Sequence, residues 1–287
     1  MNVLILGASG QLGSALARCA PAATNVVSLH RASCDLSDVA AIERSLRDSM
    51  SDIVINAAAY TAVDLAEAEP ERAYAINDEA IGVLANACAA RHARLVHVST
   101  DFVFDGSLGR PYRPDDAPQP LNVYGASKLA GERRLIGRRD LSWRIIRTAW
   151  VYAASGRNFV QTMLRLFRER DRVQVVADQI GTPTSANSLA DCVWRASVDG
   201  GDSAILHFTD AGVASWYDFA VAIYEEAREL RLIDRSVEIV PISSDQFPTS
   251  ARRPTFSVLD KSSALARLHI SPIHWRIKLR EVLKELK

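Results

Sequence analysis

The sequence feature that most constrains the fold is the segment GASGQLG at residues 7–13. It follows a short apolar run, NVLILGA (2–8), and opens a stretch of helical period, QLGSALARCA (11–20). Glycine permits a tight turn and lets backbone N–H groups approach a pyrophosphate, and the N-terminus of the next helix adds partial positive charge. This order predicts a dinucleotide-binding βαβ unit, and the alternative is a turn that needs only small residues. We expect the dinucleotide to contact Gly7, Gly10, Gln11, Leu12 and Gly13.

Short apolar runs and helical patterns alternate through the first half of the chain. The sequence predicts further strands at 25–31, 52–59, 94–104 and 143–152, and helices at 38–49, 70–92 and around Tyr124. This alternation indicates βαβ units on a parallel sheet. We therefore predict an α/β fold, a Rossmann-type doubly wound parallel sheet with a smaller C-terminal α+β substrate-binding lobe.

The pattern loosens beyond residue 152. Helices are predicted at 158–170, 188–197 and 215–230, and strands at 172–178 and 204–210. We place an NAD(P)-binding domain at 1–152, with segments around 180–210 returning to it, and a mainly substrate-binding lobe at 153–287. The proline-rich stretch 105–121 is predicted to be a long functional loop.

Composition narrows the class of protein. Lys plus Arg equals Asp plus Glu, so the formal net charge is zero and argues against nucleic acid or an anionic membrane as a partner. The four cysteines have no metal-ligand spacing, which favours free thiols in a reducing compartment. The first apolar run leads into a glycine turn and not a cleavage site, so we expect a cytoplasmic protein without a signal peptide.

The end of the second predicted strand bears on the choice of cofactor. An acid there would bind the 2′-hydroxyl of NAD, but the sequence has His30 and Arg31 instead. A basic side chain suits a 2′-phosphate, so NADPH is favoured, and the alternative is a solvated Arg31 with NADH also accepted. Asp35 and Leu36 are placed to flank the adenine. The end of the third strand, where ribose and phosphates would pass, supplies Ala58, Ala59, Tyr60 and Thr61.

The segment LNVYGASKLAGE (121–132) places Tyr124 and Lys128 four residues apart, on one face of a helix. An ammonium near a phenol favours the phenolate, so we expect Lys128 to lower the pKa of Tyr124 and to hydrogen-bond the nicotinamide ribose. The fourth strand ends with Ser99, expected near the cofactor, and Thr100, expected at the substrate carbonyl. The alternatives are an ordinary surface helix and a threonine that caps a strand end.

The glycine spacing GxxGxxG, with this tyrosine, lysine and threonine, resembles the extended short-chain dehydrogenase/reductase superfamily. A closer resemblance is carried by a set of motifs that occurs in order between residues 7 and 254: GASGQLG, NAAAYTAVDLAE, VSTDFVFDG, LNVYGASKLAGE, RTAWVY, DQIGTPT and ARRP. The set is similar to that of the dTDP-4-dehydrorhamnose reductases.

That resemblance implies an NAD(P)H-dependent reduction of the C4 ketone of dTDP-4-dehydro-6-deoxy-L-mannose to dTDP-L-rhamnose, the last step of dTDP-L-rhamnose synthesis. It implies that Tyr124 protonates the new alkoxide, that Lys128 orients the ribose and that Thr100 hydrogen-bonds the carbonyl. It also implies sugar contacts from Asp101 and Trp150, the latter through an apolar face. Two arginines, Arg252 and Arg253, are candidates for the diphosphate, and the alternative is a solvated basic turn.

One departure from the family pattern concerns a metal. Members of the family form a magnesium-linked dimer through a glutamate after the third glycine and acids on a later helix. Here Ser14 takes the first position, and Asp191 is the one clear acid on the helix. The residues therefore disfavour a Mg²⁺ site and a dimer built on it, and a homodimer of another kind stays open.

Two other functions fit parts of the pattern. An NAD-retaining sugar-nucleotide epimerase or dehydratase shares the fold and the tyrosine–lysine pair, although a dehydratase would need a glutamate beside Asp101. A non-catalytic, NADP-binding regulatory subunit of the methionine adenosyltransferase type is the other alternative. The presence of Thr100, Tyr124 and Lys128 together favours catalysis.

Overall fold

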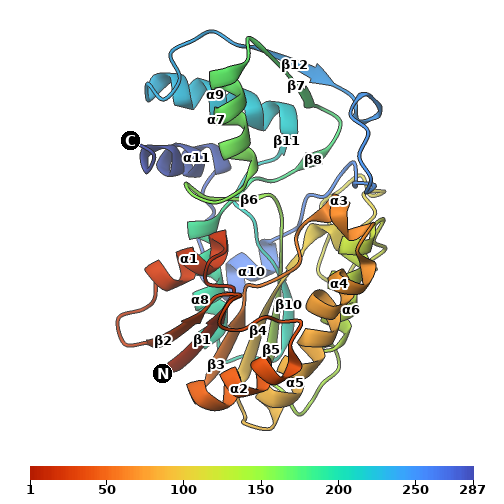
Figure 1. Ribbon diagram of the computed structural model, residues 1–287, viewed down its shortest axis with the longest axis vertical. Helices are drawn as coiled ribbons and strands as arrows, with labels where there is room; N and C mark the ends of the chain where they lie inside the picture. Colours follow the sequence, from red (N-terminus) through yellow and green to blue (C-terminus); the bar gives the residue numbers. More distant parts are fainter.

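A six-stranded, all-parallel sheet lies at the centre of the larger part of the molecule (Figure 1). The computed structural model describes residues 1–287. The strand order is β10-β5-β4-β3-β1-β2, which confirms the predicted α/β, Rossmann-type doubly wound fold. The strands are β1 (Asn2–Leu6), β2 (Asn25–Leu29), β3 (Ile53–Asn56), β4 (Arg94–Thr100), β5 (Trp143–Thr148) and β10 (Ala204–His207).

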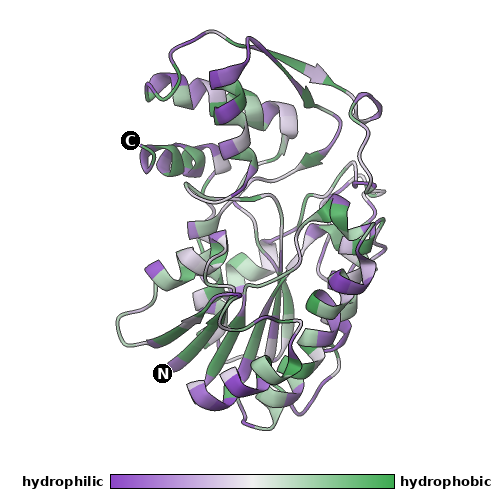
Figure 2. Cartoon of the chain, viewed as in Figure 1, coloured by the Kyte–Doolittle hydropathy of each residue, from purple (hydrophilic) through white to green (hydrophobic).

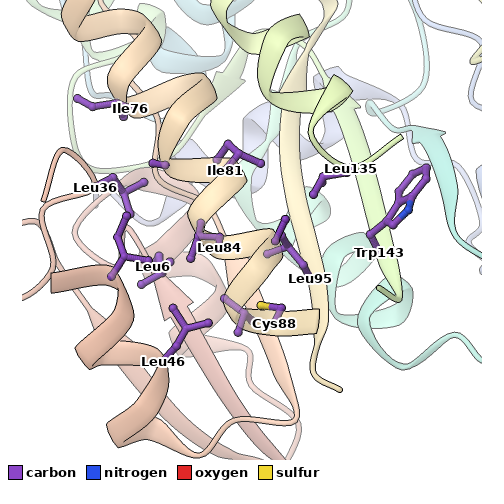
Figure 3. Packing of buried hydrophobic residues seen from close by; sticks show 14 of the residues in the cluster. Leu6, Leu36, Leu46, Ile76, Ile81, Leu84, Cys88, Leu95, Leu135 and Trp143 are labelled. Carbon is purple, nitrogen blue, oxygen red and sulfur yellow. The ribbon is translucent and has the colours of Figure 1, made fainter. Parts of the chain in front are cut away.

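Helices cover both faces of this sheet, because its strands are apolar on both sides (Figure 2). One face packs against α2 (Val39–Ser49), α4 (Pro70–Tyr74), α5 (Ala80–Ala89) and α6 (Val123–Arg133). Figure 3 shows this core, in which Leu6 and Leu95 of the strands lie against Ile81, Leu84 and Cys88 of α5. The other face packs against α1 (Gln11–Arg18), α8 (Ala186–Val198) and α10 (Ser262–Arg267).

The helix predicted over residues 70–92 is interrupted. A π-helical turn, η1 (Ala75–Glu79), joins α4 to α5. The wider turn carries the buried Asn77, whose side chain bonds Tyr60 in the loop after β3 and Ser127 in α6. Hydrophobic periodicity gave no sign of this turn, because its two flanking helices share one apolar face.

A smaller lobe lies beyond the carboxyl ends of the sheet strands (Figure 1). Its core joins α7, α9 and α11 with a parallel pair of strands, β7 and β12. The bounds are α7 (Phe159–Glu169), β7 (Arg172–Val176), α9 (Trp216–Glu229), β12 (Glu238–Ile242) and α11 (Trp275–Lys284). Neither β12, α10 nor α11 was predicted from the sequence.

Short elements connect the two parts. Two-residue strand pairs join β6 (Val151–Tyr152) to β9 (Thr184–Ser185) and β8 (Ile180–Gly181) to β11 (Ala214–Ser215). The remaining elements are α3 (Val63–Ala66) and two 3-10 turns, η2 (Asp101–Val103) and η3 (Ser244–Gln246). Three elements of the larger part come late in the sequence, among segments of the smaller lobe: helix α8, strand β10 and helix α10. The division at residue 152 stays a prediction.

The strand predicted over residues 143–152 ends early. Trp150 adopts a left-handed backbone conformation with φ of 48° and separates β5 from β6. Such a conformation is uncommon for a bulky residue. No helix of the structure combines the length and the apolar character that crossing a membrane requires.

Candidate active site

A cavity of about 950 Å³ lies at the carboxyl ends of the parallel strands, where α/β sheets of this type bind ligands. The glycine turn after β1, the ends of β2 to β5 and the first turns of α6 all contribute to its walls. It brings together most of the site residues predicted from the sequence: Gly7, Gly10, Gln11, Leu12, Arg31, Asp35, Leu36, Ala58, Ala59, Tyr60, Thr61, Ser99, Thr100, Asp101, Tyr124, Lys128, Trp150 and Arg253.

Helix α6 is held against the cavity by its first residues and by two glycines. Asn122 caps the helix by accepting a hydrogen bond from Gly125 N–H at 2.8 Å. A Cβ on Gly125 would lie 2.2 Å from the carbonyl oxygen of Phe102, and one on Gly131 would lie 2.0 Å from that of Asn77. Larger residues at either glycine would push the helix, and with it Tyr124, away from the strand ends.

Tyr124 lies in the first turn of α6, with its ring edge-on to Phe102 at a centroid distance of 5.6 Å. Burial raises the pKa of Tyr124 to about 12, and the Thr100 hydroxyl opposes that rise while the Asp101 carboxyl adds to it. The expected lowering of the Tyr124 pKa is therefore not found in this structure, where burial is the largest influence on that pKa. Tyr124 is a protonated phenol at neutral pH, which is the form that a proton donor needs.

Thr100 ends β4 and caps η2. Its hydroxyl accepts a hydrogen bond from Phe102 N–H at 3.2 Å and donates one to Asp101 Oδ1 at 3.0 Å. Asp101 is almost fully buried, its Oδ2 atom has no hydrogen-bond partner, and burial raises its pKa to about 6. A buried carboxylate oxygen without a partner is a ready acceptor for a hydroxyl group that reaches it.

Lys128 follows one turn after Tyr124 and is 1% exposed. Its Nζ donates a hydrogen bond to the Val98 carbonyl at 2.7 Å and lies 3.2 Å from His97 Nε2. Burial lowers the pKa of Lys128 to about 8, against the raising effect of the Glu132 charge. The amine therefore points along the wall toward β4 and keeps one further hydrogen-bonding position.

The glycine turn fits a dinucleotide. Gly7 has φ of 81°, and a Cβ there would lie 2.8 Å from the backbone of Ala58. A Cβ on Gly13 would lie 2.1 Å from the Gly7 carbonyl oxygen, so the first turn of α1 can approach the loop only as glycine. The result is a backbone-lined cradle at a helix N-terminus, where a pyrophosphate is stabilised.

Comparisons with known proteins agree with this geometry. The family model described as RmlD substrate binding domain matches residues 1–287. The dTDP-4-dehydrorhamnose reductase of Burkholderia thailandensis is 40% identical, over 100% of this chain and 99% of that protein. This chain belongs to that reductase family.

Two solved structures of the reductase family are closely superimposable. The dTDP-4-dehydrorhamnose reductase of Clostridium acetobutylicum has a TM-score of 0.92 at 36% identity and covers 100% of this chain and 99% of its own. The enzyme of Bacillus anthracis, in complex with NADP, has a TM-score of 0.89 at 33% identity and covers 99% and 98%. The fold therefore agrees with that of the family.

Three predicted contact residues do not line the cavity of this family member. Gly13 packs inside the turn against Gly7. His30 is exposed and its ring contacts the Ser33 hydroxyl, because the chain turns away directly after β2. Arg252 is exposed, and only its carbonyl is used, accepting a hydrogen bond from Asn122 at 2.7 Å.

Arg31 lines the cavity beside Asp35. Its Nε donates a hydrogen bond to Asp35 Oδ2 at 3.1 Å, and Asp35 also accepts from the Ser37 N–H and hydroxyl. These hydrogen bonds lower the pKa of Asp35, with the Ser37 N–H as the largest cause. Asp35 thereby holds the guanidinium while its two terminal nitrogens stay open to a phosphate.

A second cavity of about 660 Å³ adjoins the first, and Trp216 and Arg253 line both. Arg253 makes a two-point ion pair with Asp64, with Nη2 to Oδ2 at 2.7 Å and Nη1 to Oδ1 at 3.1 Å. The Trp216 ring stacks on Trp150 at 3.5 Å and 6°. One face of Trp150 is thus covered by another indole, which limits the apolar face that was predicted for a sugar.

Several residues of this site were not predicted from the sequence. Trp216 begins α9 directly after Ser215, whose capping box with Asp218 was a readable helix start. Thr148, at the end of β5, has a buried hydroxyl without a partner and lines the first cavity. Asn77 could not be found, because its position depends on the π turn.

The positions considered for a metal have other partners. Ser14 Oγ donates a hydrogen bond to the Ala8 carbonyl at 2.9 Å, and Asp191 pairs with Arg195 at 2.9 Å. No group of three or more His, Cys, Asp or Glu side chains has the geometry of a metal site. That these residues disfavour a Mg²⁺ site stays a prediction.

Proposed function

We propose that the protein reduces the C4 ketone of dTDP-4-dehydro-6-deoxy-L-mannose to dTDP-L-rhamnose with NADPH, and accepts NADH less well. The observation that carries the proposal is that one cavity contains the glycine turn, Arg31 and the three side chains Thr100, Tyr124 and Lys128. Membership of the dTDP-4-dehydrorhamnose reductase family supports the same activity.

The nicotinamide, when bound, supplies the hydride to the ketone carbon. The Thr100 hydroxyl donates to Asp101 before substrate binds, and it orients the ketone by turning its one hydrogen to the carbonyl oxygen. Tyr124 donates its proton to the oxygen, and its raised pKa, about 12, keeps that proton in place until negative charge develops. Lys128 in its charged form hydrogen-bonds the ribose and stabilises the phenolate that remains.

We place the sugar in the first cavity and the rest of the substrate toward the second. Asp101, with its unpartnered Oδ2, accepts a sugar hydroxyl. Arg253 stands between the cavities, where it can bind the diphosphate, and the nucleoside then lies in the second cavity. Arg31, held by Asp35, binds the 2′-phosphate of NADPH.

The test mixes purified protein with dTDP-4-dehydro-6-deoxy-L-mannose and NADPH, follows the loss of NADPH absorbance and identifies the product by NMR. We expect dTDP-L-rhamnose in equal amount to the NADPH oxidised. Tightly bound NAD after purification, with turnover that needs no added cofactor, would instead support an epimerase. NADPH binding without oxidation, together with a co-purifying enzyme, would support a regulatory subunit.

A further inference from the structure

A line of buried polar groups behind the cavity connects β3 to Lys128. Ala58 N–H donates a hydrogen bond to Asn56 Oδ1 at 3.1 Å, and Asn56 Nδ2 lies 3.1 Å from His97 Nδ1. The other imidazole nitrogen, His97 Nε2, lies 3.2 Å from Lys128 Nζ. Asn56 and His97 are fully buried and are register partners on β3 and β4, so their side chains share one face of the sheet. Neither residue has a part in the mechanism above.

The direction of every hydrogen in this line follows from its first member. A backbone N–H can only donate, so Asn56 turns its oxygen to Ala58 and its NH₂ group to His97. Burial holds the pKa of His97 well below 6.5, so its ring is neutral and carries one N–H. Since Nδ1 accepts from Asn56, the hydrogen is on Nε2 and points at Lys128.

This arrangement bears directly on Lys128. An ammonium has donors only, whereas a neutral amine has a lone pair that can accept the Nε2–H. We propose that Asn56 and His97 form a positioning pair that fixes the Nε2–H tautomer and thereby sets the pH at which Lys128 gains its charge. The inference rests on the proposed function, in which the charged form of Lys128 holds the ribose and stabilises the phenolate.

The other ionisable groups around Lys128 do not remove this effect. Glu132, one turn further along α6, raises the pKa of Lys128, but its carboxylate is paired with Arg147 of β5 at 2.7 Å. Tyr124 and Asp101 line the same cavity; burial keeps Tyr124 neutral, whereas the Asp101 carboxyl, with a pKa of about 6, has no hydrogen bond to Nζ. His97 is therefore the ionisable side chain in contact with Nζ.

The first experiment needs no variant. ¹⁵N NMR of labelled wild-type protein reports the tautomer of each histidine, and His97→Gln identifies the signal of His97 among the six. We expect the Nε2–H form throughout the range from about pH 6 to about pH 8. A signal of the Nδ1–H form would overturn the proposal, whatever the protein's activity.

The second experiment reverses the tautomer. In Asn56→Asp the carboxylate accepts from both Ala58 N–H and the imidazole, so His97 carries its hydrogen on Nδ1 and offers a lone pair to Lys128. The titration midpoint of Lys128 can be followed by its ¹³Cε chemical shift, because the chain has only five lysines. We expect this midpoint to rise by about one pH unit or more. The alkaline fall of kcat/KM should move by the same amount, and an unmoved ¹³Cε midpoint would overturn the proposal.

Two further variants guard this result. His97→Gln removes the fixed tautomer and lets an amide oxygen face Lys128, so its midpoint should rise as well, even if Asn56→Asp does not fold. The control is His92→Gln, which replaces an exposed imidazole that lines neither cavity and should leave the Lys128 midpoint unchanged. Because the NMR midpoints need no substrate, they separate failure of this inference from failure of the proposed reaction.

Discussion

The two halves of helix α6 treat a buried charge in opposite ways. Glu132 is fully buried and meets Arg147 through Nε at 2.9 Å and Nη2 at 2.7 Å, so its charge is matched. Lys128, one turn earlier and equally buried, has only the Val98 carbonyl and the neutral His97. This helix thus anchors itself with a complete ion pair and keeps an unmatched cation for chemistry.

The largest effect is expected on turnover, from a change at Tyr124 in the first turn of α6. Tyr124→Phe removes the donated proton and should lower kcat by about 10²- to 10⁴-fold. NADPH binding, measured by fluorescence titration, should stay near the wild-type value. Tyr217→Phe is the matched control, because Tyr217 lines neither cavity. Near-normal turnover of Tyr124→Phe would refute the assigned proton donor.

At Glu132, in the last turn of α6, the expected effect is on the free energy of unfolding. Glu132→Gln leaves Arg147 buried without its partner and should cost about 3–5 kcal/mol of the free energy of unfolding, measured by urea denaturation. The double variant Glu132→Gln with Arg147→Met removes both charges and should recover much of that loss. A single variant as stable as wild type would show that the pair does not anchor the helix.

Lys128→Met should give the contrary result. It removes a buried charge that has no anionic partner, so the free energy of unfolding at neutral pH should not fall. Turnover should drop by about 10²- to 10³-fold through the loss of a donor near the reacting groups. If the free energy of unfolding instead falls as far as in Glu132→Gln, Lys128 is also needed to hold the fold, and the contrast with Glu132 is refuted.

The smallest effect is a dependence of stability on pH. The pKa of Lys128 is about 8 when folded, against 10.5 as a free side chain, so the unfolded chain binds the extra proton between these values. Unfolding then becomes less favourable as pH rises through that window. Relative to Lys128→Met, wild type should gain up to about 3 kcal/mol from pH 8 to 10.5, read from urea midpoints. Urea midpoints that change with pH in the same way for wild type and Lys128→Met would contradict this prediction.

The frame of the molecule is predictable from local pattern. The alternation of strand and helix, the glycines at residues 7 to 13 and the spacing of Tyr124 and Lys128 each have a short-range cause. The structure brings Gly7, Gly10, Tyr124 and Lys128 to one cavity. By contrast, Asn56 and His97 look like ordinary strand residues. Their contact depends on the register of β3 with β4, which local sequence does not specify.

The error about Tyr124 has the same origin. A lysine four residues away is visible in the sequence, but the depth of burial is not, and burial is the larger influence on the pKa of this phenol. His30 and Arg252 were misplaced because one-residue changes of chain direction after a strand or before a proline decide which side chain enters the cavity. These directions depend on tertiary contacts.

The late position of β10 and α10 in the chain has a consequence for synthesis on the ribosome. The edge strand ends at His207 and the last helix covering that face ends at Arg267, so an emerging chain completes its sheet late and the cover of one face later still. Apolar residues of β4 and β5 on that face wait for α8, and those of β10 wait for α10. Nascent chains of this protein should therefore be good clients for chaperones that bind exposed apolar strands.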